Sequence, residues 1–203
     1  MKYIARTLNQ ILHPLLMPVL GLLLILNSGT YLSLLDPGAK RVLLLVLGMG
    51  TLLFPLLAFP MLHYRRVMSS ATNQPRPIEE ALLPRLVILV LYIITLVYFL
   101  RLPVNRLIQA YVLSFTLVML FYFLSGIRYR LCAHMAGFGG LIALLLTLML
   151  LYEIPLQGML VLVVIAAGIS GSTRLYLSLQ KPAEELAGFM LGFVVVGATL
   201  LLY

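Results

Sequence analysis

Long runs of apolar residues, separated by short polar segments, occupy nearly the whole chain. Several runs exceed about 18 residues, the length at which an apolar α-helix can cross a bilayer. The runs are continuous rather than alternating, which excludes the pattern of a transmembrane β-barrel. The pattern predicts seven spans, at residues 11–35, 42–62, 86–100, 107–124, 135–152, 156–173 and 183–203.

These spans predict an all-α membrane protein, a polytopic helical bundle with about six or seven transmembrane helices. We expect a single domain over residues 1–203, because no polar segment is long enough to fold alone. The first span is the least regular, since His13, Pro14 and Pro18 lie near its start and proline removes a helical hydrogen bond. No cleavable signal peptide is expected, because the first apolar run is long and contains prolines.

The last three predicted spans carry small residues four positions apart. The pairs are Ala136 and Gly140, Ala167 and Gly171, and Gly188 and Gly192. Small residues at this spacing let helix backbones approach closely in lipid. We therefore expect the closest packing, and any pocket, among the last three helices.

Composition agrees with a membrane protein and adds a predicted sidedness. Hydrophobic residues make up 63% of the chain, charged residues 10%, and the mean hydropathy is +1.10. Seven spans place the N-terminal leader and the polar segments 63–85, 125–134 and 174–181 on one side. Ten of the 14 Lys and Arg residues lie there. The positive-inside rule then places this side in the cytoplasm, and we expect a bacterial cytoplasmic (inner) membrane.

Basic side chains from three polar segments meet on this predicted side, together with one imidazole. The set is Arg76, Arg128, Arg130, Arg174, Lys181 and His134. Guanidinium forks match phosphate geometry, and imidazole exchanges protons near neutral pH. Scattered basic residues at span ends favour anionic or phosphate-bearing membrane lipids over nucleic acid as partners. One cysteine and three histidines offer no metal-ligand spacing, so no metal or cofactor is expected.

The segment from Ser172 to Gly188 resembles the third signature of the type 2 phosphatidic acid phosphatase superfamily, which includes membrane lipid phosphatases. That signature is Ser-Arg, five residues, His, three residues and Asp, usually followed by a small residue and Gly. Thr173-Arg174 stands at Ser-Arg, Pro182 where proline is common, and Ala187-Gly188 at the small pair. The resemblance implies a lipid phosphatase-like core in the C-terminal two-thirds of the chain.

Two positions depart from this signature. Gln180 replaces the histidine that is the phosphoryl-accepting nucleophile in the family, and Glu184 replaces the aspartate. His134 matches the histidine of the second signature, Pro-Ser-Gly-His, which protonates the leaving group in the family. Arg76-Pro77 fits the end of the first signature, Lys, six residues and Arg-Pro, but Ser69 stands where the lysine is expected.

The resemblance supports the fold, whereas Gln180 argues against the family's usual chemistry, because an amide lacks the basic lone pair of imidazole. The favoured hypothesis is a non-hydrolytic protein that binds a phosphate-bearing lipid headgroup, alone or as an accessory subunit of a membrane assembly. The alternative is an active lipid phosphate or isoprenyl diphosphate phosphatase in which His134 takes an acid/base or nucleophilic role. A transporter is least favoured, because all six acidic residues lie in loops or at span ends.

Overall fold

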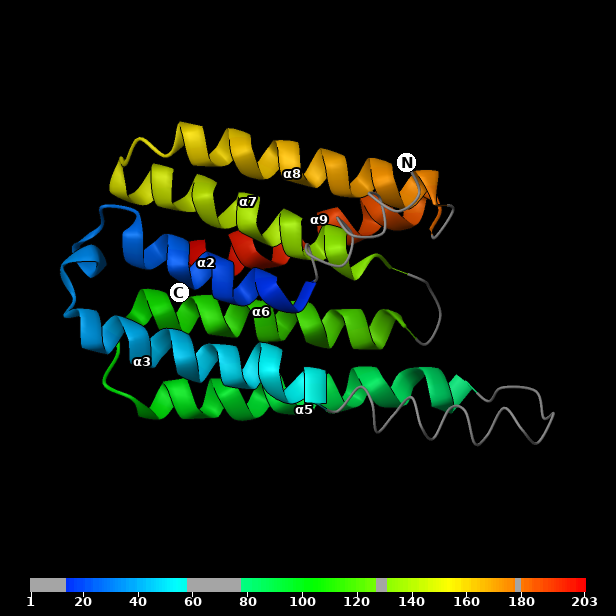
Figure 1. Ribbon diagram of the computed structural model, residues 1–203, viewed down its shortest axis with the longest axis horizontal. Coiled ribbons are helices and arrows are strands. Elements are labelled where there is room, and N and C mark those ends of the chain that lie inside the picture. Colours follow the sequence, from blue (N-terminus) through cyan, green and yellow to red (C-terminus); the bar gives the residue numbers. More distant parts are fainter. Residues whose placement is uncertain (1–13, 58–77, 127–130, 178–179) are drawn as a thin grey trace.

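The computed structural model describes residues 14–57, 78–126, 131–177 and 180–203. These residues form an elongated bundle of helices that lie side by side (Figure 1). Six of the helices are long and apolar enough to cross a membrane. The predicted all-α polytopic bundle is therefore confirmed, and the chain is an integral membrane protein.

The elements follow one another as helices joined by short connections. In order they are η1 (Pro14–Leu16), α2 (Met17–Asn27), η2 (Tyr31–Leu34), α3 (Pro37–Gly48), η3 (Met49–Leu53), α5 (Ile78–Arg101), α6 (Arg106–Ser125), α7 (Ala133–Tyr152), α8 (Gln157–Tyr176) and α9 (Pro182–Leu202). η1 and η2 are 3-10 turns, whereas η3 is a π-helical segment that continues α3. The combined span of α3 and η3 extends to Leu57.

Polar residues between the spans cap the helices that follow them. The Asp36 carboxylate accepts hydrogen bonds from the backbone N–H groups of Gly38 (2.8 Å) and Ala39 (3.3 Å) at the start of α3. The Asn105 side chain likewise accepts from the backbone N–H of Leu107 (2.8 Å) at the start of α6. Each cap satisfies N–H groups that have no partner within the helix, so these short connections fix where a span begins.

The first predicted span is wrong as a single helix over 11–35. Its described helical part, Pro14–Asn27, is shorter than the six long helices, and residues 11–13 lie outside the described residues. The chain turns at Gly29, whose φ of +78° suits glycine. The Ser28 and Thr30 hydroxyls both donate to the Ile25 carbonyl oxygen, at 3.0 and 3.3 Å, and close the end of α2.

The other spans agree with the sequence pattern to different degrees. The second begins at Pro37 rather than residue 42, and residues 58–62 lie outside the described residues. The third begins at Ile78 rather than residue 86 and continues through Pro84. The last four match the predicted ranges to within three residues at each end.

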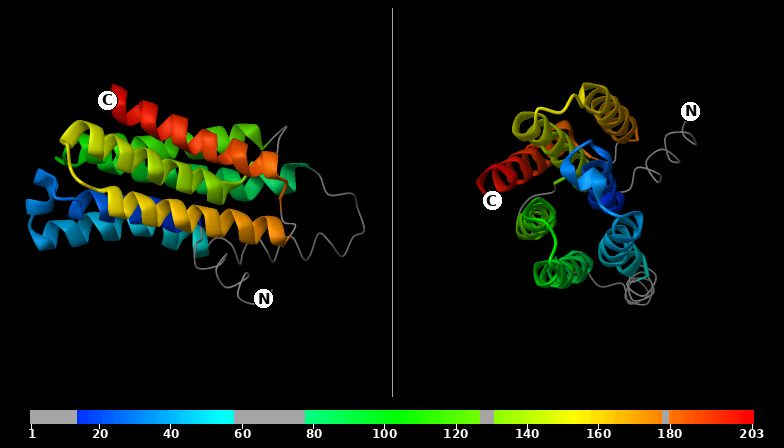
Figure 2. Two further views of the ribbon diagram at one scale, coloured as in Figure 1. Left: turned by 90° about the horizontal axis from the view of Figure 1, so that it is seen from above. Right: turned by 90° about the vertical axis from the view of Figure 1, so that its left-hand side faces the viewer.

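α7 and α9 form the most extensive helix pair, and α7 is the most buried of the six long helices. A Cβ atom on Gly188 would overlap the Cys132 carbonyl oxygen, and one on Gly192 would overlap the Ala136 carbonyl oxygen. The backbones therefore touch where the side chains are absent. The expected close packing is confirmed for these two helices, whereas α8 packs chiefly against α7 at the edge of the bundle (Figure 2).

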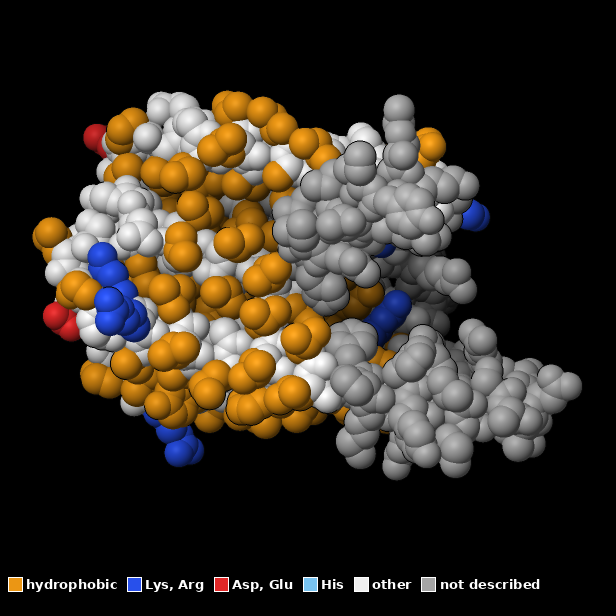
Figure 3. Space-filling view, in the orientation of Figure 1, with side chains coloured by type: hydrophobic (Ala, Val, Ile, Leu, Met, Phe, Trp, Pro, Cys, Tyr) orange, Lys and Arg blue, Asp and Glu red, His pale blue; other side chains and the backbone are white. Residues whose placement is uncertain are grey.

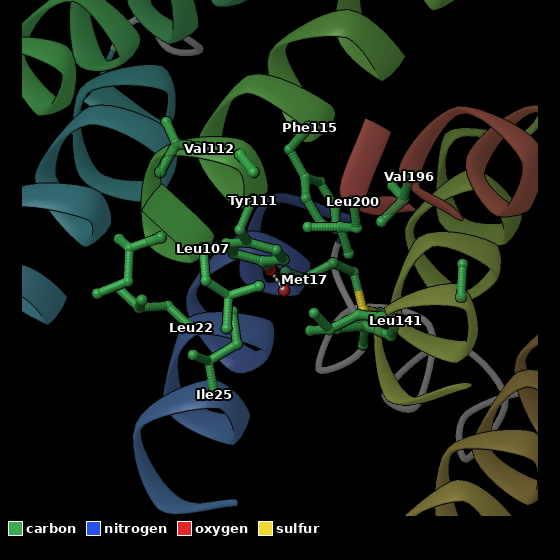
Figure 4. Close-up of a cluster of buried hydrophobic side chains, with 14 of the residues drawn as sticks. Met17, Leu22, Ile25, Leu107, Tyr111, Val112, Phe115, Leu141, Val196 and Leu200 are labelled. Atoms are coloured by element: carbon green, nitrogen blue, oxygen red, sulfur yellow. Dashed lines mark hydrogen bonds between the residues drawn. The ribbon is translucent and has the colours of Figure 1, made fainter. Parts of the chain in front are cut away.

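The buried core joins the short helix α2 to the long helices around Tyr111. This side chain is fully buried, and its hydroxyl donates a 2.8 Å hydrogen bond to the Pro18 carbonyl oxygen. Its ring packs edge-on against Phe115, with 5.0 Å between centroids. Figure 4 shows apolar side chains from α2, α6, α7 and α9 converging on this position. The bond ties the first turn of α2, which contains Pro18, to α6.

The outer surface is mainly apolar between the two ends of the bundle. Figure 3 shows hydrophobic side chains over the middle of the visible face, with Lys and Arg side chains toward both ends and Asp and Glu side chains at the left end. A broad apolar band between charged ends fits the hydrocarbon core of a bilayer.

Candidate functional site

Helices that follow one another along the chain run in opposite directions, which sorts the polar segments between two ends of the bundle. The connections at 28–36, 102–105 and 153–156 lie at one end, on the left of Figure 1. α6 and α8 end, and α7 and α9 begin, at the opposite end, which we call the α7/α9 end. Residues 131–134, 174–177 and 180–181, which belong to the predicted polar side, are therefore together at this end.

His134 and Arg174 are in direct contact there. The Arg174 Nη1 atom lies 2.9 Å from His134 Nδ1, although the residues are 40 positions apart. His134 is in the first turn of α7 and Arg174 is in the last turn of α8. The sequence predicted that these two side chains would face one site, and the structure brings them together.

This contact specifies the protonation of the imidazole. A guanidinium can only donate hydrogen bonds, so Nδ1 of His134 must be the acceptor. The ring is then neutral, with its proton on Nε2. If Nδ1 were protonated, its N–H would point at an N–H of the Arg174 guanidinium, and the two side chains would move apart. In this arrangement His134 accepts from Arg174 rather than acting as a charged acid.

Glu185 completes the cluster, and sequence reasoning missed it. Its Oε1 lies 3.9 Å from Arg174 Nε, and the residues are only 6% and 8% exposed, respectively. The resemblance drew attention to Glu184, whose Oε2 accepts from the backbone N–H of Lys181 (3.3 Å) and caps α9. Helical spacing could have identified Glu185, because it lies three positions before Gly188, on the face that packs against α7.

The remaining predicted site residues are placed less centrally or lie outside the described residues. Gln180 is half-buried, and its side-chain amide donates to the Leu131 carbonyl oxygen at 3.5 Å. Lys181 is exposed and precedes the first residue of α9. Arg76, Arg128 and Arg130 lie outside the described residues.

Backbone contacts between the starts of α7 and α9 hold the cluster in place. The Cys132 N–H donates to the Glu184 carbonyl oxygen at 3.2 Å, which joins the start of α7 to α9, and the Cys132 carbonyl accepts from the Ala136 N–H at 3.0 Å within the first turn of α7. Gly188 lies against the same peptide of Cys132. His134 and Glu185 therefore project from two helix starts that are joined through their backbones.

Cys132 is expected to be unreactive in the folded protein. Its side chain is fully buried, and burial raises the pKa of the thiol, an effect that the Met135 backbone N–H and Arg174 oppose only in part. The thiol thus stays protonated at pH 7.4, and a protonated thiol is a poor nucleophile. Maleimide labelling followed by intact-mass measurement should show almost no adduct in the native protein and complete labelling in SDS. Cys132 is the one cysteine in the sequence, so rapid native labelling would directly contradict its burial.

A narrow hollow elsewhere in the described residues offers different chemistry. It is lined by Pro18, Leu47, Thr51, Tyr92, Thr95, Tyr111, Val112, Phe115 and Thr116. The hydroxyls of its three threonines donate to carbonyl oxygens four residues earlier, at 2.7 to 2.8 Å. No charged side chain lines it. The expectation that any pocket would lie among the last three helices was wrong for this hollow, which lies among earlier helices.

Comparison of the chain with family models, with curated proteins and with solved structures found no match. The architecture and the cluster define a polytopic helical membrane protein with a His–Arg–Glu group at one end, in which the Arg and Glu are buried and the His is half-buried. Nothing in the comparisons indicates the type 2 phosphatidic acid phosphatase superfamily, so that resemblance stays a prediction from motifs.

Proposed function

We propose that this protein binds the phosphate of a lipid headgroup at the α7/α9 end without hydrolysing it. The observation that carries the proposal is the buried Arg174 guanidinium, which contacts His134 at 2.9 Å and lies beside Glu185. A buried arginine at the edge of a membrane is costly, and by default it suggests a functional site.

The depth of the cluster matches that of headgroup phosphates. α7, α8 and α9 have 20 or 21 residues, and such helices are about 30 Å long, the thickness of the hydrocarbon core. The first turns of α7 and α9 and the last turn of α8 thus lie where hydrocarbon meets headgroups. A phosphate would reach Arg174 without crossing the apolar interior.

The surroundings favour an anion. The positive ends of the α7 and α9 helix dipoles lie at this end and favour an anion, whereas the negative ends of α6 and α8, which also lie there, oppose it in part. Arg85 also belongs to the region: its guanidinium lies 4.6 Å above the Tyr122 ring, and Tyr122 is within electrostatic range of Arg174. The distribution of Lys and Arg supports a site on the cytoplasmic side of a bacterial inner membrane.

Binding is favoured over hydrolysis by the two residues at the family's catalytic positions. Gln180 carries an amide, which does not accept a phosphoryl group as imidazole does. The Nδ1 lone pair of His134 is engaged by Arg174. The resemblance and the cluster together therefore support a protein that binds a lipid phosphate. The alternative is a phosphatase, and a separate measurement of phosphate release distinguishes the two.

Binding can be tested with purified protein in detergent and two lipids that share acyl chains. Dioleoyl phosphatidic acid should stabilise the protein, because a ligand at about 100 times its Kd adds about 2.7 kcal/mol to the folded state. Dioleoyl phosphatidylcholine should not. Arg174→Lys should lower the affinity at least about tenfold, since lysine lacks the planar fork. Arg101→Gln, at the opposite end, is the matched control. Equal stabilisation by both lipids, or no effect of Arg174→Lys, would contradict the proposal.

Hydrolysis is measured separately as phosphate release from phosphatidic acid and from an isoprenyl diphosphate. We expect no release above the buffer rate. Release that is lost in His134→Gln would instead establish the phosphatase alternative.

A further inference from the structure

The Glu185 carboxylate occupies the position in front of Arg174 where a ligand anion would lie. Its Oε1 is 3.9 Å from Arg174 Nε, too far for a hydrogen bond, and accepts none from the residues the structure describes. Its Oε2 faces the α8 backbone, because a Cβ atom on Gly171 would lie 3.3 Å from it. The carboxylate is thus buried between α8 and α9, with one oxygen that accepts no hydrogen bond from the described residues.

Ser170 offers a second underused polar group close by. Its side chain is 1% exposed, and its hydroxyl oxygen has no hydrogen-bond partner among the described residues. Ser170 lies one helical turn before Arg174, on the same face of α8. Buried polar groups normally have partners, so a buried hydroxyl without one, next in sequence to the glycine that Glu185 approaches, favours a site built for another acceptor.

We propose that Glu185 is an internal competitor that makes this site selective for phosphomonoester headgroups. The inference rests on the proposed function. In the empty site the carboxylate neutralises Arg174, and a lipid phosphate must displace it, because two anions beside one buried guanidinium repel each other. A phosphate oxygen could then bind the Arg174 fork at short distance and accept from the Ser170 hydroxyl.

The charge of the headgroup determines whether it can displace the Glu185 carboxylate from Arg174. A phosphomonoester carries about −1.5 to −2 at pH 7, whereas a phosphodiester carries a single charge, no more than the carboxylate it must replace. Phosphatidic acid can therefore displace Glu185 where phosphatidylglycerol cannot. The displaced side chain has a place to go, since the exposed Lys181 lies four positions earlier on the same helix face.

The test compares Glu185→Gln with Glu184→Gln, which removes the same charge one position away. The binding of dioleoyl phosphatidic acid and dioleoyl phosphatidylglycerol is titrated by native mass spectrometry. We expect wild-type protein to prefer phosphatidic acid by at least about tenfold, because its headgroup carries roughly half to one negative charge more than that of phosphatidylglycerol. Glu185→Gln should gain at least about tenfold affinity for phosphatidylglycerol and lose most of the preference, because its competing anion is gone. Glu184→Gln should keep the wild-type preference.

Two results separate this inference from the proposed function. In the first, Glu185→Gln binds both lipids more weakly at an unchanged ratio, while wild-type binding still depends on Arg174. Glu185 then has only a structural role, so the inference fails and the proposed function stands. If neither protein binds phosphatidic acid, the proposed function fails and the inference fails with it. Should Glu185→Gln not fold, Glu185→Asp keeps the charge but moves it away from Arg174 by one methylene group. The preference of Glu185→Asp for phosphatidic acid should then be weaker than that of wild type, and an unchanged preference would overturn the inference.

Discussion

Gly192→Ala is expected to destabilise the protein by about 3 kcal/mol, the upper end of the usual cost of overpacking. The added Cβ atom would overlap the Ala136 carbonyl oxygen, and backbone cannot move aside as a flexible side chain can. α7 and α9 would have to separate along their most extensive contact. The measurement is the midpoint of thermal unfolding in detergent, which should fall by about 10 °C for a domain of this size.

Gly168→Ala on α8 is the matched control. A Cβ atom at that glycine meets nothing within 4 Å. Alanine also favours a helix over glycine by about 1 kcal/mol, so this variant should be as stable as wild type or slightly more stable. Equal midpoints for the two variants would show that α7 and α9 are not in backbone contact.

Arg174→Gln is expected to cost about 3 kcal/mol, because it leaves the Glu185 carboxylate buried without its cation. Adding Glu185→Gln removes the unpaired charge and should restore most of the lost stability. The four unfolding midpoints form a double-mutant cycle whose coupling energy measures the pair directly. The double variant should fold yet fail to bind phosphatidic acid, which separates loss of the site from loss of the fold.

Additive effects in this cycle would contradict the pairing. In that case Arg174 and Glu185 would contribute independently, and the 3.9 Å approach between them would carry no coupling. The inference that Glu185 competes with a phosphate would then lose its physical basis.

The long helices could be predicted because residues that favour helix starts precede apolar runs of the length of a membrane span. Asn105 and Pro182 mark helix starts, and the apolar runs after them have the length of a membrane span. The end of α2 could not be predicted in the same way. Residues 27–31 interrupt the leucine runs only briefly, so the apolar pattern still predicts one continuous span across a turn that the positive φ of Gly29 marks in the structure.

The candidate site was predicted in part, for a similar reason. The alternation of spans placed His134 and Arg174 at the same end, and their contact follows from the antiparallel order of α7 and α8. Glu185 was missed because the motif pointed to its neighbour. Which of two adjacent carboxylates turns inward depends on the rotation of α9 about its axis, and the Gly188 contact with α7 determines that rotation.

The position of α8 at the edge of the bundle makes the surrounding lipid part of the molecule's architecture. Val161, Leu162, Val164 and Ile165 on this helix are at least half exposed, so acyl chains form most of its outer wall. Surfactants with short tails would cover this lipid-facing surface of α8 poorly. We expect Arg174 to leave its partners in such micelles while the α7 and α9 pair persists, so long-tailed surfactants or nanodiscs should preserve the cluster best.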